Sequence, residues 1–175
     1  MPFEKLDDRD IWRLDCVQAR YRDFCRRYGL DHSEIVMCSY PLQRRWTAGI
    51  LRPLTDRIKQ GDLAAAEIGI EMMEEDRGLA FGSIIKSNLP RALAKCPLTE
   101  LQKERIRRRV VAMLLRKFMP KEFRQYAWLI RRIGLGSWQA HLESEADRSH
   151  PWVEWYLHYL TEDNPPLAPA RVWSR

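Results

Sequence analysis

The stretch PLQRRWTAGILRPLTDRIKQGDLAAAEIGIEMMEED (41–76) carries the clearest fold signal in the chain. Apolar residues recur every four positions in its first half, which places a single apolar stripe on a helix. These residues are Leu42, Trp46, Ile50, Leu54 and Ile58. Gly61 is a natural stop for that helix, and Asp62 can cap the next one. Because the connection is so short, the two helices must lie antiparallel.

Helical spacing of apolar residues continues through most of the chain, and glycine is scarce, so the sequence predicts an all-α fold of antiparallel helical hairpins. Gly29, Thr99 with Gln102, and Ser137 supply further stop and cap signals. Pro53 and Pro90 are expected to kink or break their helices. The predicted helices are residues 7–28, 41–60, 63–76, 80–95, 99–118, 120–133, 137–145 and 152–160.

The helical pairs would begin near residues 41, 80 and 120, a spacing of about 40 residues that is typical of HEAT-type repeats. Letter-by-letter similarity between these units is poor, so a short HEAT-like solenoid and an irregular bundle both stay open. We expect one helical domain over residues 1–161. The remaining residues, 162–175, form a proline-rich tail that no helix can include.

Four segments resemble a family of uncharacterised bacterial all-helical proteins. They lie in the stretch 60–134, which covers somewhat under half of the chain, and are QGDLAAAEIGIEMMEED (60–76), FGSIIKSNLPRAL (81–93), LTELQKERIRRRVVAML (98–114) and PKEFRQYAWLIRRIG (120–134). The resemblance implies helical hairpins of HEAT-like architecture. It implies no established activity, and therefore no catalytic residue.

Composition favours a soluble protein of the cytoplasm. The 175 residues are 45% hydrophobic and 31% charged, with a net charge of +6. The acidic, polar N-terminus does not have the form of a signal peptide, and the longest apolar run, residues 110–115, is too short to cross a bilayer. Cys16, Cys25, Cys38 and Cys96 form no CxxC pair, so we expect reduced and mostly buried thiols.

Positive charge is concentrated in residues 99–133, which hold eleven Lys or Arg and three acids, 11 − 3 = +8. The whole chain carries +6, so the remainder sums to −2. We predict a basic ridge on two neighbouring helices that would attract phosphates or an acidic protein. Its residues are Arg105, Arg108, Arg109, Arg116, Lys121, Arg124, Arg131 and Arg132. Alternatively, these arginines are solvated or pair with acids such as Glu71, Glu74, Glu75 and Asp76.

Aromatic residues share one face of the last helix, at Trp152, Trp155, Tyr156 and Tyr159. Such a face is most often part of a core. The alternative is an interface with a partner or with a second copy of the chain, because Trp and Tyr anchor many interfaces.

Signals for chemistry are weak. The acids at 71–76 lack the Glu-x-x-His spacing of carboxylate metal sites, and His32, His141, His150 and His158 lack the spacing of a zinc site. Cys38 with His32, or Gly82-Ser83 with Lys86, would need tertiary contacts that the sequence cannot show. We therefore expect no bound metal and no cofactor.

We interpret the chain as a non-enzymatic binding or adaptor protein whose basic surface meets a nucleic acid or an acidic protein, without membrane contact. Helical arrays expose long faces that suit recognition. Two alternatives stay open. One is an enzyme, or a subunit accessory to one, with a carboxylate-containing site near Glu71, Glu74 and Lys86. The other is a structural protein that forms homo-oligomers through the aromatic helix.

Overall fold

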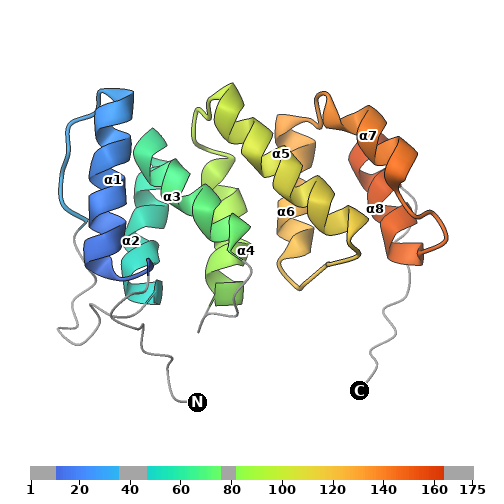
Figure 1. Ribbon diagram of the computed structural model, residues 1–175, viewed down its shortest axis with the longest axis horizontal. Helices are drawn as coiled ribbons and strands as arrows, with labels where there is room; N and C mark the ends of the chain where they lie inside the picture. Colours follow the sequence, from blue (N-terminus) through green and yellow to red (C-terminus); the bar gives the residue numbers. More distant parts are fainter. Residues whose placement is uncertain (1–10, 36–46, 76–81, 164–175) are drawn as a thin grey trace, which may run out of the picture.

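The computed structural model describes residues 11–35, 47–75 and 82–163, and these form eight α-helices and no strand. The helices are α1 (Leu14–Tyr28), α2 (Thr47–Lys59), α3 (Leu63–Glu74), α4 (Gly82–Leu93), α5 (Glu100–Leu115), α6 (Phe123–Ile133), α7 (Trp138–Glu145) and α8 (Pro151–Thr161). Figure 1 shows them following one another along the long axis, from α1 at one end to α7 and α8 at the other. The prediction of an all-α fold is confirmed.

Contacts between helices sort them into two layers. In the first layer α3 packs on α1, α5 packs on α3, and α7 packs on α5. In the second layer α4 packs on α2, α6 packs on α4, and α8 packs on α6. Successive helices also pack across the layers, as α2 does on α3 and α5 on α6. This order is what consecutive antiparallel hairpins produce, and whether they are repeats of the HEAT type stays a prediction.

Helix α3 is almost wholly enclosed, because α1, α2, α4 and α5 all contact it and nine of its twelve residues are buried. Its sequence explains how four neighbours fit. Ala64, Ala65, Ala66 and Gly69 are small enough for other helices to approach closely, and all are buried. The largest fully buried side chains around it include Ile50, Leu51, Leu54 and Ile58 of α2 and Ile68, Ile70, Met72 and Met73 of α3 itself.

The predicted helix ends agree with the structure at several caps. Gly29 follows α1 with a positive φ of 63°, a conformation that glycine adopts without strain. The side chain of Asp62 accepts a hydrogen bond from the Ala65 amide at 2.9 Å and so caps α3. Thr99 and Gln102 form the predicted reciprocal capping box at the start of α5. The tight turn between α2 and α3 is therefore built as the sequence predicted.

Other boundaries differ. Ser137 makes no capping hydrogen bond, because its backbone is already helical (φ −63°, ψ −15°) and not extended. Helix α5 ends at Leu115, since Lys117 takes a positive φ of 57° shortly before Pro120. Pro120 precedes α6 by a turn instead of opening it. Helices α2 and α4 continue through Pro53 and Pro90. The predicted starts at residues 7, 41 and 80 and most of the tail lie outside the described residues.

Candidate functional site: a buried ionic seam and a basic groove

A polar network occupies the seam where α1, α3 and α5 meet, and Glu67 of α3 lies at its centre. Only 2% of Glu67 is exposed. Its Oε1 accepts hydrogen bonds from the Tyr28 hydroxyl at 2.5 Å and from the Gln102 amide at 3.1 Å. Its Oε2 lies 2.5 Å from Nη1 of Arg105. A buried carboxylate needs this many partners to stay charged, so the seam is a satisfied structural network.

Arg105 extends the network to a second carboxylate. Its Nε and Nη2 contact the two carboxylate oxygens of Glu74 at 3.1 and 2.5 Å, a bidentate arrangement. With both Glu67 and Glu74 bound, and with its side chain 22% exposed, Arg105 presents little positive charge to solvent. For Arg105 the alternative of pairing with nearby acids is confirmed, and its placement on an outward ridge is wrong.

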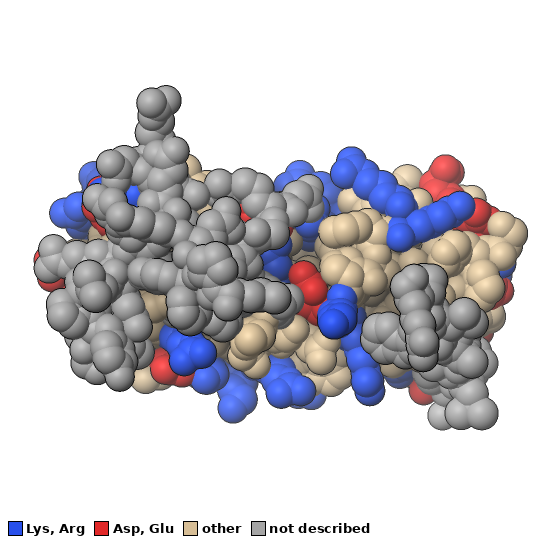
Figure 2. Space-filling view, turned by 90° about the horizontal axis from the view of Figure 1, so that it is seen from below, with Lys and Arg blue, Asp and Glu red and all other residues tan. Residues whose placement is uncertain are grey.

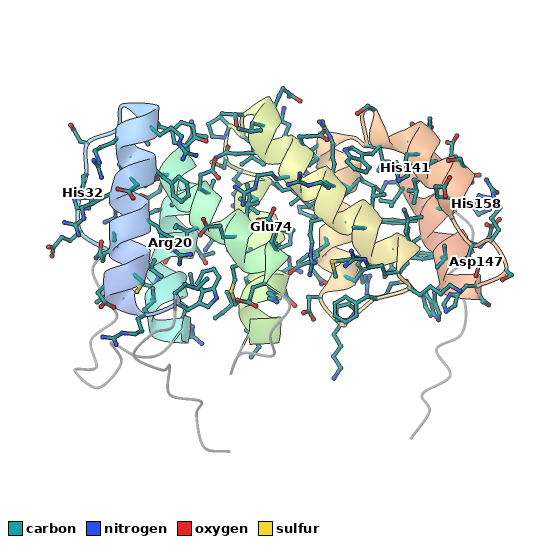
Figure 3. All side chains as sticks on the ribbon, in the orientation of Figure 1. Arg20, His32, Glu74, His141, Asp147 and His158 are labelled. Atoms are coloured by element: carbon teal, nitrogen blue, oxygen red, sulfur yellow. The ribbon has the colours of Figure 1, made fainter. Side chains whose placement is uncertain are left out.

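Glu71 and Glu75 are engaged in the same seam, and Asp76 lies outside the described residues. Nη1 of Arg20 lies 2.9 Å from the Glu71 carboxylate. Figure 3 labels Arg20 on α1 and Glu74 on α3, which mark the position of the seam. Burial raises the pKa of Glu71, although Arg20 and Arg105 act in the opposite direction. The Trp12 indole donates to Glu75 at 2.9 Å.

Lys86, which the enzyme alternative placed near these acids, donates to the Glu75 carbonyl. Arg109, also of the predicted ridge, donates through Nε to the Met73 carbonyl at 3.1 Å. Burial and the hydrogen bond to Glu67 raise the pKa of Tyr28 to about 12. Most polar groups of the seam contact another protein group, and these contacts hold three helices together, although the buried Nε of Arg20 has no hydrogen-bond partner among the residues that the structure describes.

The remaining ridge residues do not form one surface with Arg105. Arg108 of α5, Arg116 just after α5, and Lys121 are exposed. Arg131 donates to the Tyr159 carbonyl at 2.9 Å and lies over the Tyr159 ring. Figure 2 shows Lys and Arg along both long edges of the molecule instead of along one. Helix α6 packs on both α5 and α4, and whether the exposed ridge residues of α5 and α6 form one continuous surface stays a prediction.

A hollow of about 800 Å³ lies over the second layer, and we call it the α4 groove. Helix α4 contacts both α2 and α6, so it lies between the two other helices that line the groove. The lining residues are Arg52, Thr55, Asp56 and Lys59 of α2, Ile84, Ile85, Asn88 and Arg91 of α4, Ala94 and Lys95 just after α4, and Trp128 and Arg132 of α6. None of the lining residues belongs to α5.

The charge of the α4 groove is strongly unbalanced. Five lining residues are cationic, and Asp56 is the one acid. Asp56 is bound to Lys59, whose Nζ lies 2.7 Å from its carboxylate. Within the described part of the chain, no carboxylate lies at ion-pair distance from Arg52, Arg91 or Lys95. The groove therefore presents net positive charge to solvent.

A second hollow of about 290 Å³ continues the α4 groove toward α8. It shares Arg91 and Trp128 with the first hollow and adds Arg124, Gln125 and Tyr159. Arg132 lies over the Trp128 ring, 5.1 Å from its centroid, as Arg131 lies over Tyr159 at 4.9 Å. Arg124 and Arg132 thus line the same pair of hollows as Arg52, Lys59, Arg91 and Lys95, a grouping that was not predicted from the sequence.

The aromatic face of α8 is largely part of the core. Tyr156 is buried and meets Phe123 edge to face, with centroids 4.8 Å apart. Trp155 stacks on Tyr159 at 5.1 Å, and Trp152, Trp155 and Tyr159 are partly buried against the core. For Tyr156, a role as an exposed partner interface is therefore wrong, because α5 and α6 already cover this side of α8. For the other three an interface stays a prediction.

The groups considered for chemistry are scattered. No group of three or more His, Cys, Asp or Glu residues in the described ranges is placed to hold a metal ion. Figure 3 shows His32 at one end of the molecule and His141 and His158 at the other. The ring of His150 accepts a hydrogen bond from the Val153 amide at the start of α8. Cys25 and Cys96 are buried, and burial raises the pKa of both thiols, that of Cys96 to about 11. Cys38 lies outside the described residues.

Comparison with known proteins gives no match: no family model, no curated protein and no solved structure is detectably similar to this chain. None of the described helices combines the length and the apolar character required to cross a membrane. The resemblance to a bacterial helical family stays a prediction.

Proposed function

We propose that the protein is a non-enzymatic binding protein whose α4 groove receives a negatively charged partner. The observation that carries this proposal is the accumulation of five cations around one hollow with a single acid, which is itself paired. Cations that face solvent without carboxylate partners repel one another. An anionic ligand relieves that repulsion and replaces water at the guanidinium groups.

The groups in the α4 groove suit binding better than bond-making chemistry. General acid–base catalysis uses a residue whose pKa lies near the working pH, or a nucleophile beside a base. Arginine, which supplies three of the five cations, stays protonated at any physiological pH. Thr55 and Asn88 add hydrogen-bonding groups that can orient a ligand.

The test is binding of the full chain to fluorescent single-stranded RNA, duplex DNA and acidic peptides, measured by anisotropy from about 50 to about 300 mM salt. The variant Arg91→Glu/Lys95→Glu/Arg132→Glu reverses three groove cations, each of them exposed. We expect wild-type affinity for at least one probe to fall steeply with salt, and this variant to lose most of it.

A matched control separates the groove from net charge. Arg108→Glu/Arg116→Glu/Lys121→Glu makes the same change in charge at exposed positions of the predicted ridge that do not line the groove. We expect the control to bind within a few-fold of wild type. Equal losses in both variants would mean that binding follows net charge alone. If no probe binds, or if affinity does not respond to salt, the proposal is wrong.

A further inference from the structure

The α4 groove combines its cationic residues with an aliphatic surface. Ile84 of α4 is 51% exposed and lines the groove, as do Ile85 and Ala94. Exposed aliphatic surface gains free energy when an apolar group covers it, by roughly 25 cal/mol for each Å². A ligand that matches the whole groove therefore carries both negative charge and an aliphatic group.

From this pairing we propose that the partner in the α4 groove is an acidic peptide segment with an aliphatic side chain among its carboxylates. This inference rests on the proposed function and narrows it. The peptide's aliphatic side chain would cover Ile84, and its carboxylates would meet Arg91, Lys95 and Arg132. Such a segment would come from a partner protein.

The spacing of the cations agrees with an extended peptide. Arg91 and Lys95 are four residues apart, which along a helix axis corresponds to about 6 Å. Side chains on one face of an extended chain are two residues apart, or about 6.6 Å. Carboxylates at alternate positions of the peptide can therefore meet successive cations, while an aliphatic side chain at another alternate position, on the same face, covers Ile84.

The aromatic rings favour a peptide over a single-stranded nucleic acid. Strand-binding proteins offer aromatic faces on which bases stack. Here the Trp128 and Tyr159 rings each already carry a guanidinium group, from Arg132 and Arg131, and Tyr159 is also stacked with Trp155. A base would have to displace these contacts. A DNA duplex presents phosphates on a convex surface and has no aliphatic group to enter the groove and cover Ile84.

The experiment uses two labelled peptides of aspartate and glutamate that differ at one central residue, leucine in one and serine in the other. We expect the full chain to bind the leucine peptide about tenfold more tightly, the effect of burying one leucine incompletely. In Ile84→Ser the two peptides should bind equally. Leu101→Ser, on α5 and 67% exposed, removes a comparable aliphatic group outside the groove and should preserve the preference.

The outcomes distinguish the two proposals. If RNA or DNA binds and loses affinity on reversal of the groove cations, while both peptides bind weakly, the peptide proposal fails and the proposed function stands. Equal binding of the two peptides to wild type also overturns the peptide proposal. If no probe responds to the groove variant, both fail.

Discussion

In the seam between α1, α3 and α5, Arg105 contacts the carboxylates of Glu67 and Glu74, whereas in the α4 groove Arg91 contacts no carboxylate of the described chain. Arg105 lies on α5 and Arg91 lies on α4, and each of these helices packs beside other helices of its own layer. The difference lies in the facing helix. Helix α3 brings Glu67, Glu71 and Glu74 to one side of itself, opposite α5, while α2 and α6 bring further cations to the surroundings of Arg91.

The comparison separates two physical uses of one residue type. A guanidinium that bonds a buried carboxylate fixes the position of two helices relative to each other. Breaking the pair would leave the carboxylate buried with neither a cationic partner nor water, which costs free energy. A guanidinium without a carboxylate contributes little to folding and keeps its charge available to a ligand. The first layer therefore uses arginine for cohesion, and the second layer uses it for recognition under the function proposed above.

The largest expected effect tests this contrast directly. Arg105→Ala should lower the free energy of unfolding by about 3 kcal/mol, because it leaves Glu67 buried without its cationic partner. Arg91→Ala, an exposed arginine of the groove, should change it by less than about 0.5 kcal/mol. Urea denaturation followed by circular dichroism measures both values.

A second variant tests whether the loss of stability comes from the buried Glu67 carboxylate that Arg105→Ala leaves without a cationic partner. Adding Glu67→Gln to Arg105→Ala should recover part of the loss, since a neutral amide costs less to bury than a carboxylate. If Arg105→Ala and Arg91→Ala destabilise the chain equally, the seam has no special role and the contrast between the layers is wrong.

Much of this fold could be predicted from local sequence, and the reasons are visible in particular residues. Gly29, Asp62 and the Thr99–Gln102 box act through bonds within a few residues, so their signals are complete in the sequence. The pairing of Arg105 with Glu74 could be foreseen only as an alternative. It spans 31 positions and depends on α3 and α5 sharing a layer.

The α4 groove was missed because its cations are distributed over three helices. The highest local charge lies in residues 99–133, and the predicted ridge therefore joined α5 with α6, which are consecutive in the chain. In the structure the exposed side of α6 adjoins α4. Weak signals existed, namely Arg91 and Lys95, four residues apart at the end of α4 and just after it, and Glu67 inside the apolar run AAAEIGI. Neither signal shows which other helix lies opposite these residues in the folded chain.

A smaller effect is expected where the two layers meet. A Cβ added at Gly69 of α3 would lie 2.8 Å from Cδ1 of Ile58 on α2 and 3.3 Å from Cδ2 of Leu89 on α4. Alanine improves helix propensity by about 1 kcal/mol, but overpacking a dense core costs about 1–3 kcal/mol. We expect Gly69→Ala to destabilise the chain by about 1 kcal/mol, measured by thermal or urea unfolding.

The control for this contact removes the opposing atom. Ile58→Val deletes Cδ1 and should by itself cost about 1 kcal/mol. Combined with Gly69→Ala, the double variant should lose clearly less than the sum of the two single losses, because the added methyl group enters the vacated space. Strict additivity would show that α2 and α3 can separate enough to admit the methyl group without strain.

The smallest effect concerns α8, where charges pair along one helix and not between helices. The two ring nitrogens of His158 contact Glu162 at 2.5 Å and Glu154 at 3.0 Å, and these bonds raise the pKa of His158 above its ordinary value of 6.5. A raised folded-state pKa means that protonated His158 stabilises the folded chain fully below pH 6.5, and that this contribution is lost as pH rises through the raised value. Proton NMR titration should place the His158 pKa above 6.5, and Glu162→Gln should lower it. As a control, Lys59→Gln removes one charge far from His158 and should leave the His158 pKa unaltered. If Glu162→Gln does not change the His158 pKa either, the side chains of His158 and Glu162 do not contact each other in solution.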